Sequence, residues 1–344
     1  MSSVCVVTTL RAPLHETLMF VNYHLNIGVD HMYLFFDDPA DAAADVLARR
    51  SRVTSVRCDL EFWNGHTSPT PSSIIERQRL NARTGLDLAR RAGFEWIVHI
   101  DSDELLYSEQ RLDELLADVP DDVQALKFPT MEAVLDRLEY HRPFEEISQF
   151  KVHPASLGKK LLVTPEERNR LSRDAADFRR RLRWARLLGC VSVPADGYLR
   201  GHVEGKSAVR TSADLQGLDC HEPIPTARET VRASVADRAW LLHFDCRGFA
   251  GWKAKWQKLN RTGNEWMSKH RRRNVQRFAA IEETGDASRL STFYKELYFV
   301  RPYDRFILTR LALLRRLGLD PMLFNDREEV GSTDPMSASL MTEK

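Results

Sequence analysis

Apolar runs and amphipathic segments alternate through the first third of the chain. The runs at residues 4–10, 31–36, 53–58 and 94–100 are short and rich in β-branched and aromatic residues, which is typical of buried strands. The longer segments at 17–27, 40–50 and 74–92 predict helices, and Gly93 is expected to end the third one. This order predicts an α/β fold, in which helices cover both faces of a parallel sheet.

The pattern changes after residue 105. A further strand is expected at 123–128, whereas residues 130–185 are charged and predict helical or irregular structure. Short strands joined by Gly turns are expected over 196–210, followed by an apolar strand over 240–244. The segment 251–328 is expected to be helical, and the polar end 329–344 is expected to be disordered.

Acidic residues directly follow two of these predicted strands. Asp37 and Asp38 come after the strand 31–36, and the run DSDE begins at Asp101, after the strand 94–100. Ligands of open parallel sheets bind beyond the carboxyl ends of the strands. The alternative for Asp37 and Asp38 is that they are turn acids before Pro39.

The DSDE run has the chemistry of a metal site. Side chains alternate along an extended segment, so Asp101 and Asp103 are expected to point the same way. Hard carboxylate oxygens suit Mg²⁺ or Mn²⁺, and such an ion can neutralise a diphosphate leaving group. The alternative is a solvated loop in which Asp103 caps a following helix.

Composition excludes several classes of protein. The formal net charge of the 344 residues is +1, so no nucleic-acid partner is expected. The 5 scattered cysteines predict reduced thiols in a cytoplasmic protein. No stretch reaches the roughly 18 to 20 apolar residues of a membrane span, and no signal-peptide pattern is present at the start. Peripheral membrane contact stays open, for example through the basic run HRRRNVQR at 270–277.

Several features of the first 107 residues together resemble a known family. In order, they are a helix ending in Tyr23 and His24, the run GVDH at 28–31, the pair Asp37 and Asp38, a helix with Gln78 and Asn81, and a strand that contains Trp96 and Ile100 and leads into DSDE. Residues 4–107 thereby resemble GT-A-fold glycosyltransferases related to glycosyltransferase family two, of the bacterial type with a DxD motif. The sequence departs from that family at 11–13, where Arg-Ala-Pro replaces Lys-Asn-Glu.

The resemblance implies a domain organisation. A GT-A-like α/β domain would cover 1–250, with a mixed, mostly parallel sheet, flanking helices and a helical C-terminal segment at 251–328. Within it, residues 1–107 would bind the nucleotide sugar and residues 108–250 would face the acceptor.

The resemblance also implies site residues. Mn²⁺ or Mg²⁺ would be held by Asp101 and Asp103 and completed by His243 or His221, unless these histidines are structural. Donor contacts are expected from Asp37, Asp38, Arg77, Gln78, Asn81, Asp101 and Lys206. The expected catalytic base is Glu132, with Asp219 and Glu222 as weaker candidates; the alternative for Glu132 is an acid at a helix N-terminus.

The residues and the resemblance together predict a metal-dependent glycosyltransferase of the hexosyltransferase class, and the resemblance implies that it is inverting. It would move a sugar from a nucleotide-diphosphate sugar, expected to be a UDP-sugar, to a hydroxyl of a glycan, a lipid-linked or a small-molecule acceptor. Two alternatives stay open. A metal-dependent nucleotidyltransferase or phosphohydrolase would need further carboxylates around two metals. A catalytically inactive nucleotide-sugar-binding protein is compatible with the departure at 11–13.

Overall fold

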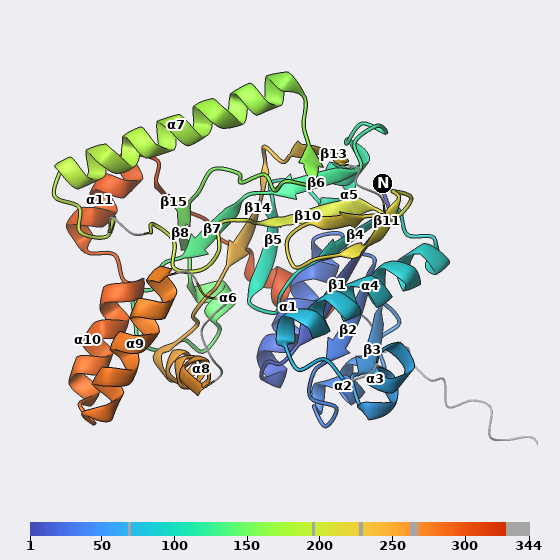
Figure 1. Cartoon of the computed structure of the whole chain (residues 1–344), viewed down its shortest axis with the longest axis horizontal. Coiled ribbons are helices and arrows are strands. Elements are labelled where there is room, and N and C mark those ends of the chain that lie inside the picture. Colours follow the sequence, from blue (N-terminus) through green and yellow to red (C-terminus); the bar gives the residue numbers. More distant parts are fainter. Residues whose placement is uncertain (68–69, 195–196, 227–229, 262–266, 268, 328–344) are drawn as a thin grey trace, which may run out of the picture.

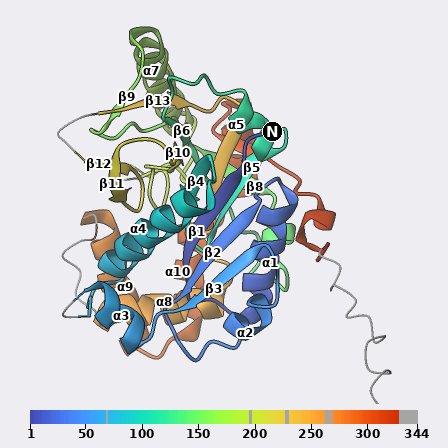
Figure 2. The same ribbon diagram turned by 90° about the vertical axis from the view of Figure 1, so that its right-hand side faces the viewer.

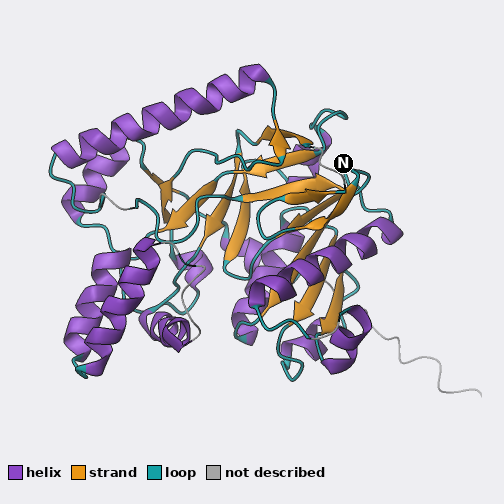
Figure 3. Cartoon of the chain, viewed as in Figure 1, coloured by secondary structure: helices purple, strands orange, loops and turns teal. Residues whose placement is uncertain are grey.

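The structure is a computed structural model that describes residues 1–67, 70–194, 197–226, 230–261, 267 and 269–327. Two sheets form its centre, and helices surround them (Figures 1 and 3). The larger sheet has eight strands, in the order β3 (Val53–Arg57), β2 (His31–Phe36), β1 (Val4–Leu10), β4 (Trp96–His99), β10 (Lys206–Arg210), β6 (Ala125–Phe128), β13 (Val231–Val235) and β9 (Leu161–Leu162).

Most neighbours in the larger sheet are parallel. Strands β3, β2, β1 and β4 run in one direction, and β6, β13 and β9 are also parallel to one another. Strand β10 is antiparallel to both of its neighbours, β4 and β6. The α/β class with a mixed, mostly parallel sheet and flanking helices, predicted from the sequence, is therefore confirmed.

The smaller sheet contains strands from distant parts of the chain. Its order is β15 (Leu314–Arg316), β8 (Gln149–Val152), β7 (Thr130–Ala133), β14 (Ala239–His243) and β5 (Glu104–Ser108). Strands β11 (Leu215–Leu218) and β12 (Pro223–Pro225) form a separate antiparallel pair. Because only residues 100–103 separate β4 from β5, the DSDE run lies where the chain passes from one sheet to the other.

Helices on opposite faces of the larger sheet account for its two cores. Side chains of β1 alternate, so that Val4 and Val6 join one buried cluster while Cys5 and Val7 join another. The first cluster includes residues of α1 (Leu14–Asn26) and α2 (Ala43–Leu47). The second includes residues of α3 (Leu60–His66) and α4 (Ile74–Ala92). Figure 2 shows α1 and α4 on either side of the strands.

Helix α4 begins and ends where local sequence signals predict. The side chain of Ser73 accepts a hydrogen bond from the backbone N–H of Ile75, and Gly93 follows the last turn with a φ of 76°, which favours glycine. Gly85 lets the helix approach the sheet closely, because a Cβ there would lie 2.6 Å from Val7 Cγ2.

The remaining helices follow β5 along the chain. Short helices α5 (Leu112–Ala117) and α6 (Pro143–Glu146) connect strands, and α7 (Pro165–Leu187) is a long helix along one side of the molecule (Figure 1). The segment expected to be helical contains α8 (Phe249–Arg261), α9 (Lys269–Glu283), α10 (Ala287–Tyr298) and α11 (Pro302–Arg310), followed by the strand β15 and a 3₁₀ helix, η1 (Pro321–Phe324). No helix in the described ranges is both long and apolar enough to cross a membrane.

Three local predictions need correction. Residues 130–185 are not only helical or irregular, because they also contribute β7, β8 and β9. These strands pair with β14, β15 and β13, which lie much later in the chain. The strand expected within 196–210 covers only Lys206–Arg210, and the helix expected at 40–50 is the shorter α2. The segment 329–344, expected to be disordered, lies outside the described residues.

Candidate active site

The strand directions gather the predicted donor-site residues at one edge of the larger sheet. Asp37 directly follows the carboxyl end of β2. Asp101 lies just beyond the end of β4, with Ile100 between them. Strand β10 runs the opposite way, with Ala208 beside Val98, so its first residue, Lys206, lies at this same edge. The polar residues of three strands and of the first turns of α4 thus come together where parallel sheets bind ligands.

Asp101 is the centre of a tightly bonded group. Its Oδ1 accepts a hydrogen bond of 2.7 Å from Gln78 Nε2, and its Oδ2 lies 2.8 Å from Lys206 Nζ. The same ammonium lies 3.4 Å from Glu104 Oε2 and donates to the carbonyl of Cys220 at 2.6 Å. Glu104 Oε2 also accepts from the backbone N–H of Asp101 at 2.8 Å, which fixes the turn between the two strands. The turn is therefore held in place by a buried lysine.

Each charged side chain in this group stabilises the ionised form of its partner. Burial alone would raise the pKa of Asp101, but the Lys206 ammonium and His99 hold that pKa well below its usual value. Burial would lower the pKa of Lys206, but the carboxylates of Asp101 and Glu104 raise it above the usual value. Both groups therefore stay ionised across the physiological range.

Asp103 belongs to a second charged group, on the side of the C-terminal helices. Its Oδ2 lies 3.4 Å from Lys255 Nζ of α8, which also lies 3.2 Å from the buried Asp245 Oδ1. Arg271 of α9 lies 3.2 Å from the same Asp245 oxygen, and Tyr298 Oη donates to Asp245 Oδ2 at 2.8 Å. Burial would raise the pKa of Asp103, but Lys255 and a neighbouring histidine hold it below the usual value. Helix α8 thus supplies a cation to the DSDE run, and α9 supplies one to the neighbouring Asp245.

A third feature is a row of three side chains across the smaller sheet. In register, His243 of β14 lies beside Glu132 of β7 on one side and Glu104 of β5 on the other. Both carboxylate oxygens of Glu132 accept from the backbone N–H of Arg200, at 2.8 and 2.7 Å, and one also accepts from Gly201 N–H at 2.5 Å. Glu132 is therefore a strand residue with a fixed carboxylate, not an acid at a helix N-terminus.

Gly201 lies directly against this row. A Cβ at that position would collide with the imidazole of His243 and lie 3.3 Å from Glu132 Oε2. The Nδ1 atom of His243 is buried and has no hydrogen-bond partner within the described part of the chain. Burial, together with the neighbouring His202, lowers the pKa of His243 and so favours the neutral form of this imidazole.

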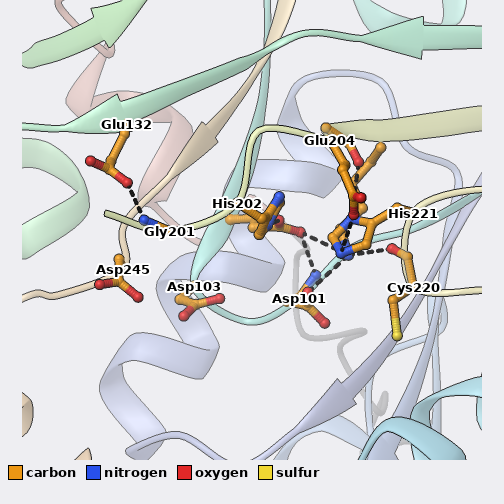
Figure 4. A network of polar contacts seen from close by, with 12 residues as sticks. Asp101, Asp103, Glu132, Gly201, His202, Glu204, Cys220, His221 and Asp245 are labelled. Atoms are coloured by element: carbon orange, nitrogen blue, oxygen red, sulfur yellow. Dashed lines mark hydrogen bonds and ion pairs between the residues drawn. The ribbon is translucent and has the colours of Figure 1, made fainter. Parts of the chain in front are cut away.

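His202 is a residue of this region that the sequence did not single out. Its Nε2 lies 2.9 Å from Glu104 Oε1, and its ring lies between those of His221 and His243, with centroid distances of 4.4 and 4.7 Å. Figure 4 shows His202 above Asp101 and Asp103, with Glu132 and Asp245 on one side and His221 on the other. The available signal was its place four residues before Lys206, in the same Gly-containing loop.

The other predicted donor residues differ in how accessible they are. The side chain of Asp37 is almost buried, and it pairs with Arg77 Nε at 2.7 Å. The largely exposed Arg11 lies 3.7 Å from the same carboxylate. Asp38 is exposed and accepts from the backbone N–H of Ala40 at 3.0 Å. Asn81 is fully buried and donates to Thr9 Oγ1 at 3.0 Å, so it links α4 to β1 inside the protein. Arg77 and Arg11 are the cations that solvent can reach at the Asp37 end.

The predicted metal ligands are not brought together as one site. Across the described ranges, no group of three or more His, Cys, Asp or Glu side chains has an arrangement that could hold a metal ion. Asp101 and Asp103 face Lys206 and Lys255, and His221 is turned to the carbonyl of Gly205, 3.2 Å from its Nδ1. As placed, these residues do not fit a metal, because ammonium groups occupy the positions from which a cation would neutralise the carboxylates.

Two plant proteins are similar in sequence to part of this chain. They are the Arabidopsis thaliana proteins Glycosyltransferase-like At2g41451 and Glycosyltransferase-like At3g57200, which are 31% and 29% identical to it. Each match covers 43% of this chain, but only 38% and 33% of the length of the respective relative. The chain thus spans well under half of either plant protein.

Similarity to solved structures is weaker. HddC from Yersinia pseudotuberculosis superposes with a TM-score of 0.33 and 11% identity, over 71% of this chain and 93% of that one. The galactosyltransferase LgtC, in complex with donor and acceptor sugar analogues, gives 0.23 and 13%, over 36% of this chain and 46% of LgtC. No family model matches the sequence.

Proposed function

We propose that this protein is a glycosyltransferase of the GT-A type, which moves a sugar from a nucleotide-diphosphate sugar to an acceptor hydroxyl. The observation that carries the proposal is the convergence of Asp37, Arg77, Gln78, Asp101 and Lys206 at the carboxyl edge of the parallel strands. Nucleotides bind at such edges in open α/β sheets. The names of the two plant relatives agree with this reaction class.

The donor would lie along this edge. The nucleoside would occupy the end near Asp37 and Arg77, and the diphosphate would approach the partly exposed cations. Arg11 is the best placed for that contact, because 63% of its side chain is exposed; Lys255, 38% exposed and shared by Asp103 and Asp245, would have to leave these acids to reach a phosphate. Lys206 is 1% exposed and neutralised by two acids, so its role is to hold Asp101 rather than to bind phosphate directly. Guanidinium and ammonium groups form charge-assisted bonds to phosphate oxygens.

Transfer needs a base that removes the proton of the acceptor hydroxyl. We assign this role to Glu132, whose carboxylate is fixed by two backbone N–H groups and lies beside His243 in the sheet. A carboxylate has about four lone-pair positions, and the three N–H contacts leave capacity for one further partner. A small shift of the loop at Gly201 would present that position to an acceptor.

The metal is a separate question that a direct experiment answers. Because Asp101 and Asp103 already have ammonium partners, we derive no step through a metal. Calorimetric titration of UDP with and without Mn²⁺ should show whether the ion is needed. If Mn²⁺ strengthens UDP binding and Asp103→Ala removes that effect, the cation displaces Lys255 and the metal role is restored.

The compartment and the stereochemistry are further parts of the proposal. All five cysteines are free, and four of them are buried, which agrees with a reducing compartment such as the cytoplasm. Inversion at the anomeric carbon is proposed from the resemblance to family two, and proton NMR of the product sugar would report it directly. A UDP-hexose is the first donor to test, with glycan, lipid-linked and small-molecule acceptors.

The reaction itself is tested by release of nucleotide diphosphate from a panel of nucleotide sugars, followed by mass spectrometry of the product. Wild type should release the nucleotide and glycosylate an acceptor. Glu132→Gln should still bind the donor but lose at least about a hundredfold in turnover, as expected for loss of a general base. Glu296→Gln, an exposed acid of α10, is the matched control. Donor binding without turnover by wild type, with all acceptor classes, would instead indicate a nucleotide-sugar-binding protein.

A further inference from the structure

The C-terminal end of α7 and the neighbouring α11 form an apolar surface. Its large side chains are between 45% and 76% exposed, and they make up six of the fourteen exposed large apolar residues in the described part of the chain. We call this set the α7–α11 patch: Trp184, Leu187, Leu188, Val191, Tyr303 and Phe306. Large exposed apolar clusters of this kind mark interaction sites.

The two parts of the patch are tied to each other. Tyr303 Oη of α11 donates a hydrogen bond of 2.8 Å to the carbonyl of Leu188, at the end of α7. The buried carboxylate of Asp304 accepts from the backbone N–H and the hydroxyl of Ser192, at 2.9 and 2.6 Å. Figure 1 shows the end of α7 beside α11, as these bonds require. The exposed side chains are thus presented by two helices that are tied together.

The surroundings of the patch are strongly basic. Residues 178–188, FRRRLRWARLL, contain five arginines and no acid. Two of these arginines, Arg180 and Arg181, pair with Asp177. Arg179 and Arg183 are exposed and have no carboxylate partner among the residues that the structure describes. Arg186 donates only to the carbonyls of Val193 and Pro194, so its charge is not neutralised.

Helix α11 also contributes basic residues around the patch. Arg301 is exposed at its start, and the guanidinium of Arg310 lies 5.5 Å from the ring centre of Phe306. The acid of this helix, Asp304, is turned inwards. The patch therefore combines aliphatic and aromatic tips with a rim of cations.

The basic run of α9, which the sequence suggested as a membrane contact, is different. Arg271 lies against the buried Asp245, and Arg277 pairs with Glu296 at 2.7 Å. These two charges are thus engaged within the protein, whereas Arg179 and Arg183 beside the α7–α11 patch face solvent.

We propose that the α7–α11 patch docks on an anionic phospholipid surface. Leu187, Leu188 and Trp184 would enter the interface between headgroups and acyl chains, while the arginines would contact lipid phosphates. This inference does not depend on the proposed enzymatic function.

Other occupants fit the chemistry less well. A second copy meeting the same surface about a two-fold axis would bring the two arginine sets together, and like charges at an interface are unfavourable. Nucleic acid would match the arginines, but it offers no apolar layer for Leu187, Leu188 and Val191. A bilayer surface satisfies both the charged rim and the apolar centre.

The test is flotation of the purified full chain with vesicles of phosphatidylcholine alone or mixed with phosphatidylglycerol. Wild type should float with the anionic vesicles, and less so as salt is raised. Arg179→Gln with Arg183→Gln should lower the partition coefficient about 25-fold, because each arginine near an anionic surface contributes about fivefold. Trp184→Ala should lower it about tenfold through lost apolar burial.

The matched control lies on the same helix. Arg168→Gln with Arg173→Gln changes the net charge equally in the first half of α7, away from the patch, and should leave flotation unchanged. Far-ultraviolet circular dichroism of each variant checks that it is folded. The proposal is overturned if wild type does not float with anionic vesicles, if the control pair lowers binding as much as the patch pair, or if the patch variants abolish dimerisation or nucleic-acid binding instead.

Discussion

Replacing Lys206 with methionine removes the ammonium that lies between two carboxylates. The side chain of Lys206 is 1% exposed, Glu104 is fully buried, and Asp101 is 23% exposed. Methionine has a similar length, so the change deletes the charge and its hydrogen bonds with little loss of packing volume. The variant therefore measures how much the charged group at the sheet edge contributes to stability.

The expected cost follows from the contacts. Breaking a buried ion pair by removing one partner destabilises a protein by about 3–5 kcal/mol, since a buried charge is left without compensation. Asp101 keeps the hydrogen bond from Gln78 and some solvent contact, which lowers the cost, whereas the carbonyl of Cys220 loses its donor. We therefore expect Lys206→Met to reduce the free energy of unfolding by about 3 kcal/mol.

Urea unfolding followed by circular dichroism measures this change as a shift of the midpoint at constant slope. Asp101→Asn and the double variant complete a cycle, with a coupling energy of about 1–3 kcal/mol expected for groups in contact. Lys253→Met is the control, because Lys253 is exposed and lies 3.9 Å from Glu282; it should cost less than about 1 kcal/mol. A loss of less than about 1 kcal/mol for Lys206→Met, or strictly additive effects of the two substitutions, would refute the reasoning.

Two further predictions concern packing and pH. Gly85→Ala should destabilise the protein by about 1–3 kcal/mol in the same assay, because the new methyl group would lie 2.6 Å from Val7; an unchanged midpoint would show that α4 moves freely on β1. Burial lowers the pKa of Lys127 to about 8. Between about pH 8 and 10.5 the native state has therefore lost this proton while the unfolded state still binds it, so the free energy of unfolding rises with pH. Lys127→Met should therefore be most favourable relative to wild type near pH 7 and lose about 1–3 kcal/mol of that advantage by pH 10; a pH-independent difference would contradict the assigned pKa.

Local signals in the sequence were sufficient for several elements of the first third of the chain. The bounds of α4 were predictable because a capping serine and a terminal glycine act within one turn of the helix. Strands β1 and β2 were predictable because both faces of a central parallel strand are buried, which leaves an unbroken apolar run.

Long-range pairing explains what the sequence could not predict. Strand β7 is four residues long and becomes a strand through pairing with β14 and β8, so the location of Glu132 within a strand has no local signal. The segment 251–328 was expected to be helical, but α11 ends at Arg310, Ala312 adopts a φ of 50°, and β15 follows to pair with β8.

The candidate site likewise combines residues that local signals predict with contacts that only long-range pairing creates. Asp37 and Asp101 could be placed at strand ends because they follow recognisable strands. The ion pair between Asp101 and Lys206 joins residues that are 105 positions apart, and its consequence, an acid neutralised by lysine where a metal was expected, depends on the antiparallel insertion of β10. His202 was missed for the same reason, since its contact with Glu104 exists only when β5 and the loop before β10 are adjacent.

The most direct test of the central claim is a thermal-shift titration with a panel of nucleotide-diphosphate sugars, using wild type, Arg77→Ala and Arg91→Ala. Arg77 lies at the sheet edge against Asp37, whereas Arg91 is exposed in the last turn of the same helix. At about a hundredfold excess over Kd, a ligand adds about 2.7 kcal/mol to stability. At least one nucleotide sugar, with UDP-sugars first, should raise the Tm of wild type and Arg91→Ala but not that of Arg77→Ala. If no nucleotide sugar raises the Tm of wild type, or if Arg77→Ala responds as wild type does, the proposed donor site is wrong.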